Sequence, residues 1–366
     1  MGAAGSHFKL PDSRPLRRRS FNDRDYRVEK RCVIRNPIHE DAITCIYGVR
    51  PGLVVTGSRD KTLALSNYET GECLRRWSHH RKDITKIVYH QNIGKHHLFS
   101  ASRDATISLW QFGNSTPVVQ YLGHELAVTG LAIANDVLFS GSRDNSLKQW
   151  DISTGQCQLT RKQNRNLVTH LCWSKNQQLL AQTSEDKELK LWDPRDLSLV
   201  HCFPKKQYLQ MHCDISSDGL YCLSSSNGFN GSGGEISLYD LRQRRLHREF
   251  FGHDATVHCA TFLQQQVTWK KLIVSVSADH TVKLWNMDDG TVIWTEHIPS
   301  GGALLTAVGF NDGSVVVGGD RACLCHLRLQ GSHGRLFLQN LTMQVQQCSP
   351  ESHSSYAIAS RNSMLD

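Results

Sequence analysis

The chain has 366 residues, of which 39% are hydrophobic and 21% are charged, the composition of an ordinary globular protein. No apolar run approaches the ~18 residues of a membrane-spanning helix, so the sequence predicts no such helix. The amino terminus lacks the apolar segment of a secretory signal, and we therefore expect a cytoplasmic protein.

The formal net charge of +8 is concentrated in residues 1–31. Nine Lys or Arg and four Asp or Glu give this segment +5, which leaves +3 for the rest of the chain. So small an excess over the remaining residues does not favour nucleic-acid binding. We expect residues 1–31 to form a disordered basic arm.

The arm begins with Met-Gly-Ala-Ala-Gly-Ser, which fits the pattern for N-myristoylation of Gly2 once Met1 is removed. One myristoyl chain gives only marginal membrane affinity, and a cluster of basic residues on an anionic surface strengthens it. Arg17, Arg18 and Arg19 form such a cluster. We therefore expect a two-part membrane anchor, the alternative being an unmodified basic arm.

A unit of about 40–45 residues recurs beyond the arm. The copy at Gly123–Asp151 contains two apolar alternations and then a polar turn, which predicts three short antiparallel strands. The turns of the copies carry an aspartate, at Asp60, Asp104, Asp144, Asp186, Asp279 and Asp320. A further copy, without that aspartate, spans Asp214–Arg242, so the chain contains seven units.

Four side chains recur in the units: a histidine, a serine, the turn aspartate and a tryptophan. Three copies have all four, namely His80/Ser102/Asp104/Trp110, His124/Ser142/Asp144/Trp150 and His253/Ser277/Asp279/Trp285. The first copy has His39, Ser58 and Asp60, with Ser66 in place of Trp, and the fourth has Ser184, Asp186 and Trp192, with Asn164 in place of His. The fifth and seventh copies have lost most of the set.

The Gly-His and Trp-Asp ends of the unit resemble those of the WD-repeat family, in which each unit forms one blade of a β-propeller. The resemblance implies an all-β fold with seven blades. Within a blade we expect His124, Ser142, Asp144 and Trp150 to meet in one chain of hydrogen bonds, because a buried carboxylate requires donors. A Ser-His-Asp hydrolase triad is the other interpretation, but a catalytic triad is needed once and this set repeats.

Seven blades occupy residues 32–342 as one domain, and we expect residues 343–366 to be a disordered tail. Ring closure in such propellers commonly takes one strand from the other end of the chain. Residues Cys32–Ile34 are placed to be the outer strand of the last blade, and Arg335–Leu341 is the competing segment. Two longer connections are also expected, at Asn227–Glu235 in blade five and around Gln264–Lys271 in blade six.

Blades four and five end in Trp-Asp-Pro-Arg and Tyr-Asp-Leu-Arg. Both resemble the W/Y-D-x-R ending with which WD-repeat substrate receptors of cullin-type ubiquitin ligases contact the ligase adaptor. The resemblance implies that Arg195 and Arg242 dock such an adaptor. The simpler interpretation is that these arginines satisfy the strand-end carbonyls and solvent.

The twelve cysteines occur without a C-x-x-C pair, and we expect reduced, buried thiols. His79-His80 and His96-His97 suggest a metal site. However, His80 belongs to a blade, and we expect the second pair in a loop. We predict no metal, no cofactor and no small-molecule substrate.

Six runs (LVTHLCW, QTSEDK, LKLWD, FPKKQ, SNGFNG and DLRQ) resemble a cilium-associated member of the family. That resemblance implies work in cilium assembly or transport, at the cilium or its base, with regulators of small GTPases among the partners. We therefore expect a non-enzymatic scaffold at a membrane, and a ubiquitin-ligase substrate receptor as the alternative.

Overall fold

The computed structural model describes residues 37–342, with gaps at 93–94, 135, 164, 229–231 and 333–334. The chain divides into two units, residues 1–31 and 32–366, and every described residue belongs to the second. The predicted arm with Gly2 and Arg17–Arg19, and the predicted tail 343–366, lie outside the described residues.

The described chain forms seven four-stranded antiparallel sheets, each built from four consecutive strands. Blade one contains β1 (Ile43–Arg50), β2 (Leu53–Ser58), β3 (Thr62–Asn67) and β4 (Glu72–Ser78). Blade two contains β5 (Ile84–Asn92), β6 (Lys95–Ser102), β7 (Ile107–Trp110) and β8 (Val119–Tyr121). Blade three contains β9 (Val128–Ala134), β10 (Val137–Ser142), β11 (Ser146–Asp151) and β12 (Cys157–Lys162). Blade four contains β13 (Val168–Ser174), β14 (Leu179–Ser184), β15 (Leu189–Trp192) and β16 (Leu199–Cys202).

The remaining three blades follow the same plan. Blade five contains β17 (Gln210–Ile215), β18 (Tyr221–Ser226), β19 (Ile236–Asp240) and β20 (Arg245–Phe250). Blade six contains β21 (Val257–Leu263), β22 (Leu272–Ser277), β23 (Thr281–Asn286) and β24 (Val292–His297), and a short 3₁₀ helix, η1 (Pro299–Gly301), follows it. Blade seven contains β25 (Leu304–Gly309), β26 (Ser314–Gly319), β27 (Leu324–Ser332) and β28 (Arg335–Asn340).

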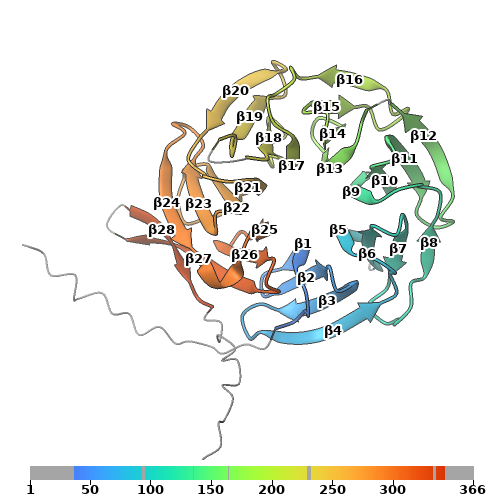
Figure 1. The fold of residues 1–366 in the computed structure, drawn as a ribbon, viewed down its shortest axis with the longest axis horizontal. Coiled ribbons are helices and arrows are strands. Elements are labelled where there is room, and N and C mark those ends of the chain that lie inside the picture. The colour runs from blue at the N-terminus through green and yellow to red at the C-terminus, as the bar shows by residue number, and fades with distance from the viewer. Residues whose placement is uncertain are drawn as a thin grey trace, which may run out of the picture. The chain divides into compact units, whose positions relative to one another are not determined.

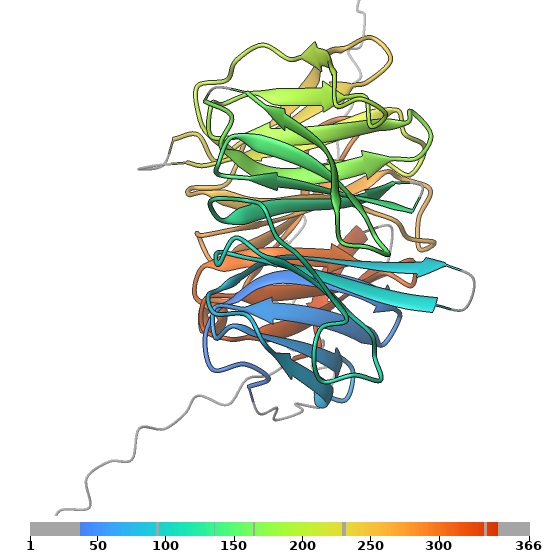
Figure 2. The same ribbon diagram turned by 90° about the vertical axis from the view of Figure 1, so that its right-hand side faces the viewer.

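The sheets are arranged around a central axis, with the first strand of each innermost and the fourth outermost (Figure 1). The second strands are buried on both faces because neighbouring sheets cover them, and all of β22 is buried. The outer strand β12 is exposed along its whole length. The prediction of an all-β, seven-bladed propeller is therefore confirmed. Figure 2 shows the ring from the side, with the β5–β6 hairpin extending beyond one face.

Ring closure uses the second of the two predicted segments, because Arg335–Asn340 forms the outer strand of blade seven. Residues Cys32–Ile34 lie outside the described residues. Blades seven and one meet through a cluster that includes Ile43, Tyr68 and Phe310. Gly48 permits this contact, since a Cβ at that position would lie 2.8 Å from the Phe310 ring. Within the described residues, the seam is thus closed by side-chain packing.

Threonines on the innermost strands connect the first five blades. The hydroxyls of Thr44, Thr85, Thr129 and Thr169 each donate to a carbonyl on the first strand of the next blade. By register, the equivalent positions of blades five, six and seven carry Met211, His258 and Leu305, which have no hydroxyl. The two halves of the ring therefore differ in how their blades are joined. No helix in the described part of the chain is long and apolar enough to cross a membrane.

Candidate functional site

In the blades that keep them, the repeated polar residues meet near the turn between the second and third strands. In blade three, His124 Nδ1 lies 2.8 Å from Asp144 Oδ2, and His124 Nε2 lies 2.7 Å from Ser140 Oγ. The Trp150 indole donates to Ser140 Oγ at 2.7 Å. The Asp144 carboxylate also accepts from the backbone N–H groups of Glu125 and Ser146. One hydrogen-bonded chain thus joins tryptophan, serine, histidine and aspartate.

The serine in the hydrogen-bonded network of blade three is Ser140, whereas the sequence predicted Ser142. Ser142 Oγ donates to the Leu126 carbonyl at 3.0 Å and accepts from the Asp144 N–H at 3.1 Å, so it supports the turn. Ser140 lies two residues earlier on the same face of β10, diagonally across the ladder from Trp150. The prediction for Ser142 is corrected to Ser140 for this reason.

The same correction applies to the other complete sets. Ser100 replaces Ser102 in blade two, with Ser100 Oγ 2.7 Å from His80 Nε2 and 2.8 Å from Trp110 Nε1. Ser275 replaces Ser277 in blade six, with the same two distances to His253 and Trp285. The histidines of these blades contact their turn aspartates, Asp104 at 3.1 Å and Asp279 at 2.8 Å.

Blade one keeps the histidine and the aspartate but not the tryptophan. His39 contacts Asp60 at 2.9 Å, and Thr56 takes the serine position at 2.7 Å from His39 Nε2. Ser66 stands where the other blades have tryptophan, and its buried hydroxyl has no partner in the described chain. The predicted Ser58 supports the turn, as Ser142 does in blade three.

Blade four replaces the histidine network with a buried lysine. Asn166, twenty residues before Asp186 as His124 is before Asp144, takes the histidine position and exchanges hydrogen bonds with Gln182. The predicted Asn164 lies outside the described residues. Lys190 Nζ contacts the Asp186 carboxylate, lies 3.1 Å from Asn166 Oδ1 and lies 3.1 Å from Glu188 Oε2. Because Gln182 occupies the serine position, the buried Trp192 indole N–H has no partner among the described residues.

Blades five and seven have lost the set, as the sequence predicts. In blade five, Ser224 Oγ donates to Gln210 Oε1 at 2.7 Å, and Tyr239 takes the tryptophan position. In blade seven, the backbone N–H of Asp320 donates to the Ala303 carbonyl. The equivalent bond in blade three runs from the Arg143 N–H to the Ala127 carbonyl, and Arg143 is the residue before the turn aspartate Asp144. Asp320 is therefore one residue before the turn position, and its assignment as a turn aspartate is wrong.

Arg195 and Arg242 lie just beyond the third strands of neighbouring blades, β15 and β19. The side chain of Arg195 is 86% exposed, and its Nη2 lies 2.5 Å from Asp193 Oδ2. The side chain of Arg242 is 55% exposed and lies 3.5 Å from Asp240. Equivalent positions in adjacent sheets place both guanidinium groups on the same face of the ring, where a partner can reach them.

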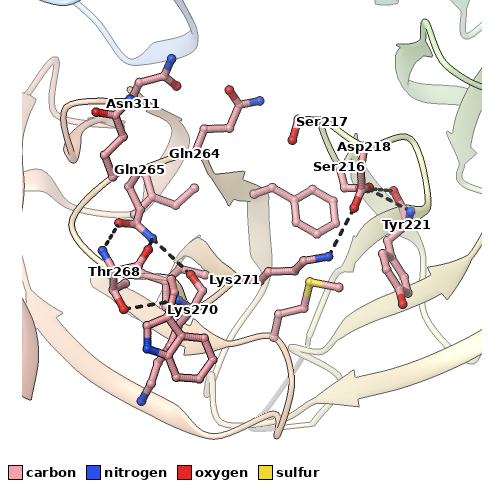
Figure 3. Close-up of a pocket in the computed structure, with 16 residues that line it drawn as sticks. Ser216, Ser217, Asp218, Tyr221, Gln264, Gln265, Thr268, Lys270, Lys271 and Asn311 are labelled. Carbon is pink, nitrogen blue, oxygen red and sulfur yellow. Dashed lines mark hydrogen bonds and ion pairs between the residues drawn. The ribbon is translucent and has the colours of Figure 1, made fainter.

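A cavity of about 380 Å³ opens on that face between blades five and six (Figure 3). The turn Ser216–Asp218 lines one side, and the blade-six connection that the sequence marked as an insertion lines the other. The length of that connection was the only signal for the cavity in the sequence. The apolar lining residues Tyr221, Phe262 and Met287 come from β18, β21 and the turn after β23, and nothing in their spacing brings them together.

The candidate metal and thiol positions are also placed by the structure. His97 lies within β6 and is paired with His90 of β5, so the loop predicted for His96-His97 is wrong. No group of three His, Cys, Asp or Glu side chains within the described ranges could hold a metal ion. Among the described cysteines, Cys73 and Cys157 are exposed rather than buried, which corrects the prediction for these two.

Two protein-family models match the chain. The model described as "Nucleolar protein 10-like, N-terminal domain" covers residues 129–322, which is more than half of the chain, and the model described as "WD domain, G-beta repeat" covers residues 71–111. The chain belongs to this family of WD-repeat propellers. Both matches fall on blades whose geometry is given above.

Individual proteins resemble this WD-repeat propeller more distantly. Periodic tryptophan protein 2 of Arabidopsis thaliana is 25% identical over 69% of this chain and 28% of its own length. Nuclear distribution protein nudF of Aspergillus niger is 25% identical over 69% of this chain and 60% of its own length. The chain thus spans only part of these relatives. The crystal structure of the WD40 β-propeller domain of Doa1 matches with a TM-score of 0.65 and 20% identity, covering 82% of this chain and 94% of that one, which shows the fold alone.

The networks of this propeller are arranged to hold ionised carboxylates inside the sheets. Burial alone would raise the pKa of Asp60, Asp104, Asp144 and Asp279. Hydrogen bonds from the paired histidine and from the Ser or Thr two residues further on outweigh burial and lower the pKa well below the usual range. In blade three, both ring nitrogens of His124 and the Ser140 hydroxyl are engaged and buried. This geometry is that of a fold-stabilising network.

Because the pKa values of these four carboxylates are lowered in the folded protein, we expect the propeller to lose stability in acid. Because their folded pKa lies below the unfolded value of about 3.9, they stabilise the fold fully above about pH 5 and progressively less as the pH falls. We expect the free energy of unfolding, measured by urea titration at several pH values, to fall steeply below about pH 4. In Asp144→Asn the fall should be shallower. An equal slope for variant and wild type would contradict the assignment.

Proposed function

We propose that this WD-repeat propeller is a non-enzymatic scaffold that binds protein partners on its faces while its basic arm holds it at a membrane. The observation that carries the proposal is the place of the repeated polar residues. Each network is buried and holds its own blade, so the residues that differ between blades are left to carry specificity. Exposed connections such as the blade-six insertion and the arginines after β15 and β19 are of that kind.

The membrane part of the proposal is supported by the sequence of the arm. Gly2 carries the acyl chain, and Arg17–Arg19 contact the anionic leaflet, because the two signals together provide the affinity that either lacks alone. The proposed place of action is the cytoplasmic side of membranes at the cilium or its base. The support for the cilium is the resemblance of six sequence runs to WD repeat-containing protein 31, with regulators of small GTPases as the proposed partners.

The anchor is tested by Gly2→Ala in ciliated cells. Without the acyl chain, the arm retains only its electrostatic contribution, so we expect the membrane-bound fraction to fall by about tenfold or more. Gly5→Ala, in the same segment but outside the acceptor position, is the matched control. Intact-mass measurement of the wild-type protein should show loss of Met1 and gain of a myristoyl group. Retention of the Gly2→Ala protein on membranes would overturn the anchor.

The second candidate is a substrate receptor of a cullin-type ubiquitin ligase. It is favoured by the two exposed arginines at equivalent positions of neighbouring blades. On this proposal the double variant Arg195→Ala/Arg242→Ala should recover at least about tenfold less ligase adaptor than the wild type, since buried interface arginines are frequent hot spots. Arg245→Ala, an exposed arginine on β20, is the control. Equal recovery of the adaptor by both variants and the wild type would exclude this role.

A further inference from the structure

The blade-six insertion presents an exposed tryptophan beside a preformed cavity. Trp269 is 86% exposed, more than any other large apolar residue in the described part of the chain. A tryptophan in this setting contributes nothing to the core, yet it offers a large contact area with few rotatable bonds. Exposed tryptophans beside cavities are frequent centres of protein interfaces.

The insertion is a structured loop. The side-chain amide of Gln265 donates to the carbonyls of Thr268 and Lys270 at 2.9 and 3.2 Å, and it accepts from the Thr268 N–H at 2.8 Å. Gln265 also forms a β-bridge with Asp312 of blade seven. The loop that carries Trp269 is thus held against two blades before any partner arrives, which lowers the entropic cost of binding.

The cavity beside Trp269 has an apolar wall, and side-chain amides surround its opening. Tyr221, Phe262 and Met287 contribute the apolar wall. Gln264 and Asn311 stand at the opening (Figure 3), and Gln266 also lines the cavity. The side-chain amides of these three residues form no hydrogen bond to any described residue. A free carboxamide has the same donor and acceptor as a peptide group, so this rim matches the backbone of an extended chain.

The charges at the cavity are matched within the protein. Lys271 lies 3.3 Å from Asp218 and 5.6 Å from the centre of the Tyr221 ring. Lys270 interacts electrostatically with Asp289. Lys271 is thus paired with Asp218, and the charge of Lys270 is offset by the nearby Asp289 without an ion pair. The charges at the site are balanced, so it favours an uncharged occupant over an anionic membrane or a nucleic acid.

We propose that this cavity binds an uncharged, extended segment of a protein partner. An apolar side chain of the segment packs against Trp269, Tyr221 and Met287, and its peptide groups exchange hydrogen bonds with the free amides of Gln264, Gln266 and Asn311. The inference rests on the proposed scaffold function and identifies one of its docking surfaces. The site is independent of Arg195 and Arg242, which are not among its lining residues.

The test selects ligands for the purified full-length chain from a phage-displayed library of random twelve-residue peptides. Synthetic versions of the selected peptides are then titrated against wild type, Trp269→Ala, Gln266→Ala and, as the control on another exposed aromatic outside the cavity, Phe251→Ala. We expect uncharged peptides with a shared apolar residue, a loss of affinity of at least about tenfold in Trp269→Ala, and no change in Phe251→Ala. Unchanged thermal midpoints establish that the variants fold.

Four outcomes would overturn the proposal. The first is that the selected peptides bind Trp269→Ala with the same affinity as wild type, and the second is that only charged peptides are selected. The third is Trp269-dependent binding to vesicles of phosphatidylcholine and phosphatidylserine. The fourth is much tighter peptide binding by a chain that lacks residues 343–366, which would make that segment the occupant. A failure of the proposed docking surface can be distinguished from a failure of the proposed scaffold function. If partners recovered from cells by wild type are recovered equally by Trp269→Ala, the scaffold function stands and this surface is wrong.

Discussion

Asp144→Ala is expected to lower the free energy of unfolding by about 3 kcal/mol. The carboxylate accepts from His124 and from the backbone N–H groups of Glu125 and Ser146, and its side chain is only 5% exposed. Alanine leaves these donors without a partner in a site that excludes most water. The thermal midpoint of the ring should fall by about 5 °C, because an unfolding entropy of about 2.1 cal/mol/K per residue over roughly 300 residues makes 1 kcal/mol worth about 1.6 °C.

Asp136→Ala is the matched control, because Asp136 also contacts a histidine, His90 at 2.8 Å, but its side chain is 59% exposed. An exposed pair of this kind contributes at most about 1 kcal/mol. Urea titration followed by tryptophan fluorescence measures both variants. Equal effects of the two substitutions would show that the His–Asp contact in blade three is no more than a surface pair.

The networks explain which parts of the molecule could be predicted from the sequence. Histidine, aspartate and tryptophan recur at nearly constant spacing, and those three side chains meet in blades two, three and six as the spacing predicts. The serine was assigned wrongly because Ser140 and Ser142 lie on the same face of one strand. The pairing register of β10 and β11 places Ser140 diagonally opposite Trp150. Only this register shows that Ser140 belongs to the network and that Ser142 supports the turn.

The degenerate blades show a second limit. Without the histidine, the sequence does not show which residue of a blade occupies the histidine position, so Asn164 and Asn166 could not be distinguished in blade four. For the same reason Asp320 was assigned as the turn aspartate of blade seven. Lys190 gave no signal either, because a lysine on a strand is normally expected to be exposed. Its burial depends on Asp186 and Glu188, whose arrangement comes from the turn.

The cavity and the ring seam depend on contacts between blades. The sequence marked both segments that compete for the outer strand of blade seven, but the choice is made by pairing between β27 and β28. The insertion in blade six was visible from its length alone. Gln265 holds this insertion so that Trp269 lines the same cavity as Tyr221 and Met287. That arrangement depends on contacts between neighbouring blades and on no local sequence pattern.

Lys190→Met is the second substitution with a large expected effect, a loss of about 3 kcal/mol in the free energy of unfolding. The Lys190 side chain is 2% exposed and contacts Asp186, Glu188 and Asn166. Methionine fills a similar volume but leaves the Asp186 carboxylate, which is 11% exposed, without a cation. Breaking one side of a buried ion pair costs far more than the pair contributes, and chemical unfolding measures the difference.

Lys148→Met is the control for this substitution, since Lys148 occupies the same position in blade three. Among the described residues, its ammonium group hydrogen-bonds only to the Thr160 hydroxyl, in a solvent-exposed bond. A rescue variant sharpens the test. Asn166→His and Gln182→Ser, added to Lys190→Met, would rebuild in blade four the chain that joins Trp150, Ser140 and His124 in blade three, and would give the Trp192 indole an acceptor. We expect this triple variant to recover most of the lost stability. If it is no more stable than Lys190→Met alone, blade four does not depend on a donor to Asp186, and the equivalence drawn between its lysine and the histidines of the other blades is wrong.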